Sequence, residues 1–228
     1  MLTVLQTALE VGLIYGLVAL ALFISFSILN IADLSTDGCF TLGCAVGAML
    51  TIAGHPILAL FAAMAAGMLS GYVTAFLQTR LGVESILAGI ISNTGLYTIN
   101  LAVMGFSSNV SITGVDTVFS LFKGLVGGQW SRLILLALIV AVIVIVLIRF
   151  FGTSLGLSIR ATGDSLDMVS ASSINPKATI TIGLCLANAL TALSGCLIGE
   201  YNKFCDINLG TGMVTIALAS LIIGEVFA

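Results

Sequence analysis

The run Val11–Ala32, VGLIYGLVALALFISFSILNIA, decides the fold class of this chain. It holds 22 consecutive residues without Asp, Glu, Lys or Arg, and a bilayer core of about 30 Å needs about 20 helical residues to cross it. Six more uncharged apolar runs follow: Gly38–Gly54, Ile57–Leu77, Ile86–Met104, Leu133–Ile148, Ala178–Gly199 and Thr211–Gly224. We expect the first six of the seven runs to be helices that span, or nearly span, a membrane.

The composition indicates the same class. Hydrophobic residues make up 59% of the 228 residues and charged residues only 7%, whereas a soluble globular chain carries about 25% charged residues. Disorder needs low hydrophobicity, and no basic block indicates nucleic-acid binding. In lipid only helices and closed barrels satisfy their backbone groups, and these runs are too long for barrel strands. The predicted fold class is all-α, a polytopic membrane helical bundle forming one domain over residues 1–228.

The two ends of the sequence carry separate expectations. The last run stops at Glu225–Ala228 without a cap, a polar tail or a basic anchor. We therefore expect the C-terminal part of the bundle to be truncated in this chain, with a half-membrane segment over Thr211–Ala228 as the alternative. The N-terminus lacks the basic region and the cleavage site of a signal peptide, so the first helix is expected in the mature protein.

Pairs of glycines four residues apart predict close packing between helices, because they let two backbones approach each other. With 25 glycines in the chain, several such pairs are expected by chance, and they say nothing about a substrate. The pairs are Gly12/Gly16, Gly43/Gly47, Gly67/Gly71 and Gly195/Gly199.

Carboxylates near the apolar runs should avoid lipid, since an ionised side chain at mid-bilayer costs at least about 2.5–3.5 kcal/mol. Asp33 and Asp37 therefore either mark a polar break at the membrane edge or line a water-filled cavity. The turn-like composition of NIADLSTD favours the edge. Glu10, Glu200 and Glu225 stand at run ends, where exposure at the interface would explain them.

The fourth run places Asn93, Tyr97 and Asn100 at positions i, i+4 and i+7, on one face of a helix. These side chains could line a translocation path. They could equally form hydrogen bonds between helices, worth about 0.6–2 kcal/mol each. The spacing favours neither alternative.

The segment 152–177, GTSLGLSIRATGDSLDMVSASSINPK, is the most informative polar stretch. Within it Ser165–Ser173 is compatible with a short helix, bracketed by the helix breakers Gly163 and Asn175-Pro176. Leu166, Val169 and Ser170 fall near helical spacing, so one face could dock onto another protein. A solvated loop would explain the polarity but not this bracketed helix.

Motifs for catalysis, cofactor binding or metal binding are absent from the sequence. There is no GxSxG, no HExxH and no Walker-type GxxxxGK[ST], so any ATP dependence must come from a partner. The single histidine, His55, lies in a Gly-His-Pro turn, and the five cysteines show no metal-binding spacing. We expect no catalytic residue, no cofactor and no metal site.

The chain resembles the permease subunits of ATP-binding-cassette importers of the branched-chain amino acid and ribose type. Three parts carry the resemblance: Gly12–Leu20 with Asn30–Asp33, the segment Gly156–Pro176, and Leu193–Leu197 with Gly210 and Leu221–Gly224. It is closest to a branch associated with the uptake of aromatic amino acids such as tryptophan and tyrosine.

The resemblance implies a subunit of a homodimer in the bacterial plasma membrane, with residues 152–177 as a cytoplasmic coupling loop. A cytoplasmic ATPase would dock there, and an extracellular or periplasmic binding protein would deliver the solute. The implied coupling residues are Arg160, Ala161, Gly163, Asp164, Asp167, Val169 and Ser170. A cytoplasmic 152–177 puts the N-terminus outside, which the distribution of basic residues barely favours.

Two other classes remain open from the sequence. An ion-coupled secondary transporter would use intramembrane carboxylates such as Asp33 and Asp37. A membrane scaffold without transport activity would leave the bracketed helix in residues 152–177 without a role.

Overall fold

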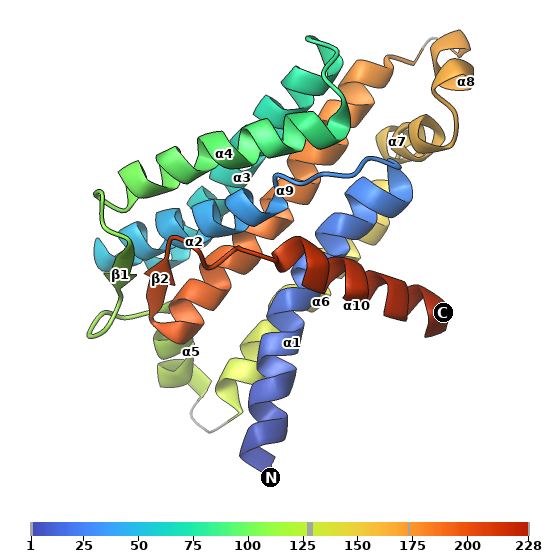
Figure 1. The fold of residues 1–228 in the computed structure, drawn as a ribbon. Coiled ribbons are helices and arrows are strands. Elements are labelled where there is room, and N and C mark those ends of the chain that lie inside the picture. Colours follow the sequence, from blue (N-terminus) through green and yellow to red (C-terminus); the bar gives the residue numbers. More distant parts are fainter. Residues whose placement is uncertain (1, 127–129, 173, 228) are drawn as a thin grey trace.

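The protein is described here by a computed structural model that covers residues 2–126, 130–172 and 174–227. Figure 1 shows a bundle of helices with two short strands at one side. The helices are α1 (Leu2–Leu22), the π-helix η1 (Phe23–Ile28), α2 (Thr36–Ile52), α3 (Pro56–Thr79), α4 (Ser85–Val103), α5 (Val118–Val126), α6 (Ser131–Phe151), α7 (Ser154–Asp164), α8 (Leu166–Ala171), α9 (Pro176–Asn202) and α10 (Met213–Phe227). Strands β1 (Asn109–Ser111) and β2 (Phe204–Asp206) pair antiparallel.

The prediction of an all-α polytopic membrane protein is confirmed. Within the described residues, five helical stretches are long and apolar enough to cross a membrane: Thr3–Ile28, α3, α4, α6 and α9. The second run forms a helix of the predicted length, displaced by two residues toward the N-terminus. Helix α2 has 17 residues, or about 25 Å at 1.5 Å per residue, against a hydrocarbon core of about 30 Å.

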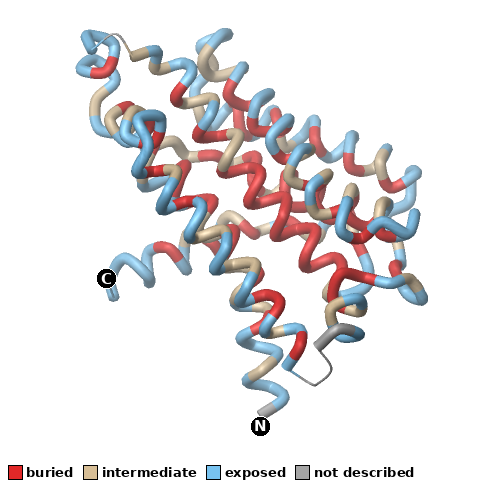
Figure 2. The backbone as a smooth tube through the Cα atoms, turned by 180° about the vertical axis from the view of Figure 1, so that it is seen from behind, coloured by how far each residue is buried: buried red, intermediate tan, exposed pale blue. Residues whose placement is uncertain are grey.

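Helix α9 is the centre of the bundle, and α2 and α3 pack along it. In the most apolar 18 residues of α9, 83% are buried, against 11% in α6. Figure 2 shows the same contrast, with a nearly continuous buried stretch through the middle of the molecule. Helix α6 therefore turns most of its surface to lipid, while α2 is enclosed by protein and need not match the bilayer thickness.

Three of the four predicted glycine pairs lie where helices meet α9. A Cβ added to Gly43 of α2 would overlap the carbonyl oxygen of Ala192, and one added to Gly195 of α9 would overlap that of Phe40. Backbone thus touches backbone between these helices. The same holds for Gly67 and Gly71 of α3 against α9, and Gly47 and Gly199 meet cysteine side chains. A Cβ on Gly12 or Gly16 would meet nothing within 4 Å.

The first apolar run stops being helical at Ile28, earlier than its composition indicates. The backbone widens into η1, and the amide of Ile31 donates to the carbonyl of Ser25 at 2.8 Å. Asn30 then takes a left-handed conformation with φ 55°, which Asn tolerates better than most residues. The chain leaves the helix here and crosses to α2 as an irregular segment.

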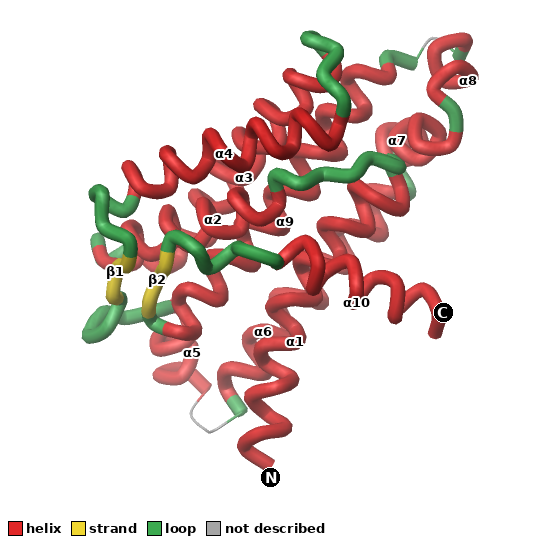
Figure 3. The backbone as a smooth tube through the Cα atoms, in the orientation of Figure 1, coloured by secondary structure: helices red, strands yellow, loops and turns green. Residues whose placement is uncertain are grey.

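The segment 152–177 forms two helices instead of one. Residues 154–164, which precede the predicted short helix, are themselves helix α7, capped by the Thr153 hydroxyl, which accepts from the amide of Gly156 at 3.3 Å. Ser165 is extended and caps the shorter α8. The predicted C-terminal residue Ser173 lies outside the described residues. Figure 3 shows α7 and α8 at the opposite end of the molecule from the N-terminus and α5.

We predict that Gly195→Ala destabilises the protein by about 1–3 kcal/mol, because the new methyl group forces α2 and α9 apart. Thermal unfolding of the purified chain in detergent measures this. Gly16→Ala is the matched control: it has open space around it, and Ala is the better helix former by up to about 1 kcal/mol. Equal melting temperatures for the Gly195→Ala and Gly16→Ala proteins would contradict the backbone contact.

Candidate functional site

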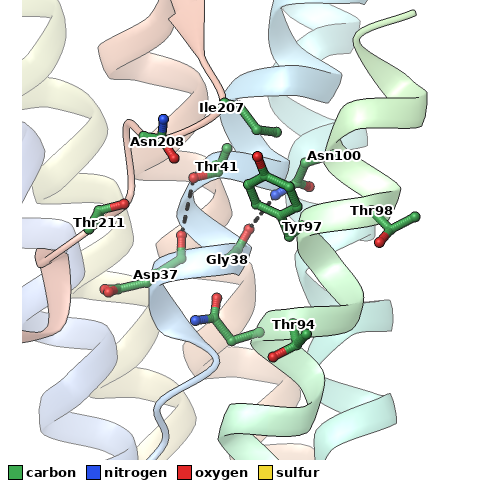
Figure 4. A pocket seen from close by; sticks show the side chains of 11 residues that line it. Asp37, Gly38, Thr41, Thr94, Tyr97, Thr98, Asn100, Ile207, Asn208 and Thr211 are labelled. Carbon is green, nitrogen blue, oxygen red and sulfur yellow. Dashed lines mark hydrogen bonds between the residues drawn. The ribbon is translucent and has the colours of Figure 1, made fainter. Parts of the chain in front are cut away.

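A polar cavity of about 400 Å³ lies between α2, α4 and the connection from β2 to α10. Figure 4 shows its lining side chains around one space, with Tyr97 of α4 near the middle of the view. Asp37 is the only lining residue with a carboxylate, and most of the others carry a hydroxyl or an amide. The lining residues are Asp37, Gly38, Thr41, Asn93, Thr94, Tyr97, Thr98, Asn100, Ile207, Asn208 and Thr211.

Asp37 fixes the start of α10. Its carboxylate accepts from the backbone amides of Val214 at 2.9 Å and Gly212 at 3.0 Å. A negative charge is stabilised at a helix N-terminus, where amides lack partners within the helix. One turn further along α2, the hydroxyl of Thr41 accepts from the amide of Gly210 at 3.1 Å. These bonds hold the 207–212 wall of the cavity against α2.

The three polar residues of α4 have two different roles. Asn100 is buried, and its amide donates to the carbonyl of Gly38 at 3.0 Å, tying α4 to α2. Tyr97 is largely exposed at the rim of the cavity. The amide oxygen of Asn93 lies where a Cβ on Gly38 would be. All three residues line the cavity, and Asn100 also bonds between helices. The interhelical alternative thus holds for Asn100, while a translocation path stays a prediction.

Asp33 is not among the cavity-lining residues. Its side chain is buried, with one oxygen accepting from the amide and the hydroxyl of Ser35 and the other accepting from Asn188 of α9 at 2.8 Å. Asp33 therefore avoids lipid, as expected, through enclosure by protein, and the position of its segment at the membrane edge stays a prediction. Enclosure by protein allows the carboxylate to sit there, because α9 supplies a donor.

Two of the three glutamates expected at the interface are buried as well. Glu200 accepts from the Thr51 hydroxyl at 3.0 Å and from the amide of Val118 at 2.9 Å, which caps α5. Glu10 accepts from Tyr201 at 3.0 Å and from Gln6 at 2.9 Å. Such local donors replace water around each carboxylate. The third, Glu225, is exposed and accepts from Ser27 at 2.8 Å.

The helices α7 and α8 form a separate candidate site at one end of the bundle. Gly163 is pressed against η1, because a Cβ there would overlap the carbonyl oxygen of Ile28. The hydroxyls of Thr162 and Thr179 bond at 2.8 Å and join α7 to α9. Helix α7 is thereby fixed to the membrane helices on two sides.

The predicted coupling residues divide between buried and exposed positions. Val169 is buried and packs α8 inward, Gly163 and Ala161 are partly buried, and Arg160, Asp164, Asp167 and Ser170 are exposed. Two apolar side chains beside them also face outward: Leu166 is 53% exposed and Met168 is 62% exposed. Leu166 and Met168 lie two positions apart, so they expose apolar surface on different sides of this short helix.

Five polar side chains of the cavity were not predicted from the sequence. Thr94 and Thr98 follow Asn93 and Tyr97 by one position and could have been found from the same helical spacing. Thr41 follows the predicted Asp37 by one helical turn. Asn208 and Thr211 join the site only because the 206–212 segment folds back onto α2, and no local pattern indicates that contact. Nothing in the described residues groups three or more His, Cys, Asp or Glu side chains for a metal.

Comparisons with known proteins cover nearly the whole chain. A family model described as a branched-chain amino acid transport system permease component matches residues 4–227. A tyrosine transport system permease protein of Clostridioides difficile is 35% identical over 214 residues, covering 93% of this chain and 70% of the relative. An uncharacterized protein of Rickettsia prowazekii is 35% identical over 222 residues, covering 97% and 77%. No solved structure matches significantly.

The resemblance noted in the sequence is thus confirmed by a family match over almost every residue, on a bundle whose helices can cross a membrane. The chain is a multi-pass transmembrane permease and belongs to the branched-chain amino acid transport system permease family.

Proposed function

We propose that this permease is the membrane subunit of an ATP-binding-cassette importer, in which a partner ATPase drives the uptake of an amino acid or a similar small solute. The observation that carries the proposal is the pair α7–α8, fixed to the membrane helices and presenting exposed apolar side chains at one end of a chain of this family. Residues 1–228 act as one permease domain, and residues 152–177 are its coupling segment.

The ATPase docks on the outward face of α8. Leu166 and Met168 provide the apolar contact, while Asp167 and Ser170 provide polar groups beside it. Buried Val169 acts as a positioning residue that holds this face outward. Because this ATPase is cytoplasmic, α8 faces the cytoplasm in the proposed orientation. The N-terminus, α5 and the β1–β2 pair then lie on the outside. A binding protein delivers the solute to that outer end, in a bacterial plasma membrane.

The cavity between α2 and α4 forms part of the solute path, which two copies of the chain complete as a homodimer. Its amides and hydroxyls offer both donors and acceptors, which suits the ammonium and carboxylate of an amino acid. Asp37, already bonded to α10, shapes the wall and leaves binding to Asn93 and Tyr97. The tyrosine permease among the relatives supports an aromatic amino acid as the solute, and the Tyr97 ring offers it a stacking partner.

We predict that Met168→Asp weakens ATPase binding at least about tenfold, which corresponds to about 1.4 kcal/mol, because a charge replaces an apolar contact. The measurement is co-purification with the cognate ATPase, followed by ATP-driven uptake in proteoliposomes. Met168→Leu, which keeps the size and the apolar surface, should behave like the wild type.

Normal ATPase binding by the Met168→Asp protein would contradict docking on α8. Uptake that persists without ATP and stops when a proton gradient is collapsed would instead support the ion-coupled alternative.

We predict that Asn93→Ala and Tyr97→Ala each raise the KM for solute uptake about 2- to 12-fold, since a lost hydrogen bond costs about 0.5–1.5 kcal/mol. Uptake is measured in proteoliposomes with the ATPase present. Ile99→Ala is the control, because Ile99 lies on the same helix, is exposed and does not line the cavity. If all three substitutions change KM equally, the cavity is not part of the solute path.

A further inference from the structure

A second, largely apolar groove lies on the lipid side of the bundle. It has a volume of about 380 Å³ and runs between the end of α1 with η1 and the last turns of α6. Helix α7 closes it at one end. The lining residues are Leu20, Phe23, Ile24, Val144, Leu147, Ile148, Phe151, Gly152, Leu157 and Arg160. Arg160 is the single charged residue among them.

Arg160 stands at the closed end of this groove. Its guanidinium carbon lies 5.6 Å from the centre of the Phe151 ring, a distance at which a cation is attracted to an aromatic face. No carboxylate pairs with it in the part of the chain that the structure describes. The nearest acidic residue on α7, Asp164, lines a different cavity with Leu29 and Ile180. Arg160 therefore forms no ion pair within the described residues, although Asp164 lies one turn away on the same helix.

The surroundings of the groove are those of a lipid contact. Ile148 is 67% exposed and Leu157 is 57% exposed. Helix α6, which supplies four of the ten lining residues, is the least buried of the helices that can cross the membrane. Helix α7 follows α6 directly, where the apolar run ends at Arg149. Because the uncharged run of α6 ends here, we place the groove where acyl chains meet headgroups, with its cation toward the headgroups.

We infer that this groove binds an anionic phospholipid, with one acyl chain between α1 and α6 and the phosphate on Arg160. An apolar trough suits the chain, and a guanidinium binds phosphate with two parallel hydrogen bonds. An anionic lipid is favoured over a zwitterionic one, because the latter's own ammonium competes for the phosphate. Arg160, one of the implied coupling residues, is thereby assigned to lipid. This site depends on membrane insertion and not on the proposed transport function.

The test is native mass spectrometry of the full chain in detergent with equal amounts of palmitoyl-oleoyl phosphatidylglycerol and phosphatidylcholine. One basic residue near an anionic membrane surface is worth enough for a preference of about fivefold. We expect phosphatidylglycerol to bind about fivefold more than phosphatidylcholine, and Arg160→Gln to bring the ratio close to one. Arg149→Gln, at an exposed cation outside the groove, should keep the preference.

A second arm tests the acyl chain. Val144→Trp fills the groove and should reduce binding of both lipids, whereas Val142→Trp, on another face of α6, should not. Glycerol 3-phosphate and inorganic phosphate, which lack the chain, should fail to displace phosphatidylglycerol. Displacement by either one would show a bare phosphate site and overturn the inference. An unchanged lipid ratio in the Arg160→Gln protein would overturn it as well.

Discussion

The backbone contact between α2 and α9 is the constraint on which the rest of this structure depends. Gly43 and Gly195 leave no room for a side chain between the two helices. In lipid, apolar burial does not drive helices together, so close packing of small residues must do so. This contact encloses α2, a helix of 17 residues at the lower limit for crossing a bilayer, and brings Asp37 to the cavity. A wider spacing would separate Asp37 and Asp33 from the groups that they bind.

Several carboxylates around this contact stabilise the fold by accepting hydrogen bonds. Asp33 is bonded to α9 through Asn188, Asp37 caps α10, and Glu200 caps α5. Each attaches an irregular segment or the first turn of a helix to the rest of the bundle, among apolar helices. Donors from the protein replace water in each case, as burial of a charge requires. Carboxylates saturated in this way are poorly suited to exchanging protons or ions, so they give the ion-coupled alternative little support.

The apolar runs were sufficient to predict the helices, because a membrane imposes length and lack of charge on every spanning segment. They were insufficient wherever a helix is enclosed by protein. Because protein surrounds it, helix α2 need not match the thickness of the bilayer. For the same reason Glu200 and Asp33 can be charged without facing lipid. Glycine spacing alone also fails to distinguish Gly12/Gly16 from Gly43/Gly47, since a close contact depends on the partner helix. The side of the cavity formed by α4 could be predicted, because its polar residues share one helical face. The side formed by residues 207–211 could not, because these residues are distant in the sequence.

The proposed ATPase surface and the cavity are joined by a short, continuous route. Gly163 of α7 touches the carbonyl of Ile28 at the end of η1. From there the chain passes through the segment 29–35, held by Asp33 to α9, and reaches Asp37 at the cavity. Because η1 ends in an irregular segment, a shift of α7 acts on a joint of non-helical backbone. The same joint borders the lipid groove, since Phe23 and Ile24 line it. A lipid held by Arg160 therefore contacts both α7 and η1, the two elements through which a force from the ATPase would reach the solute path.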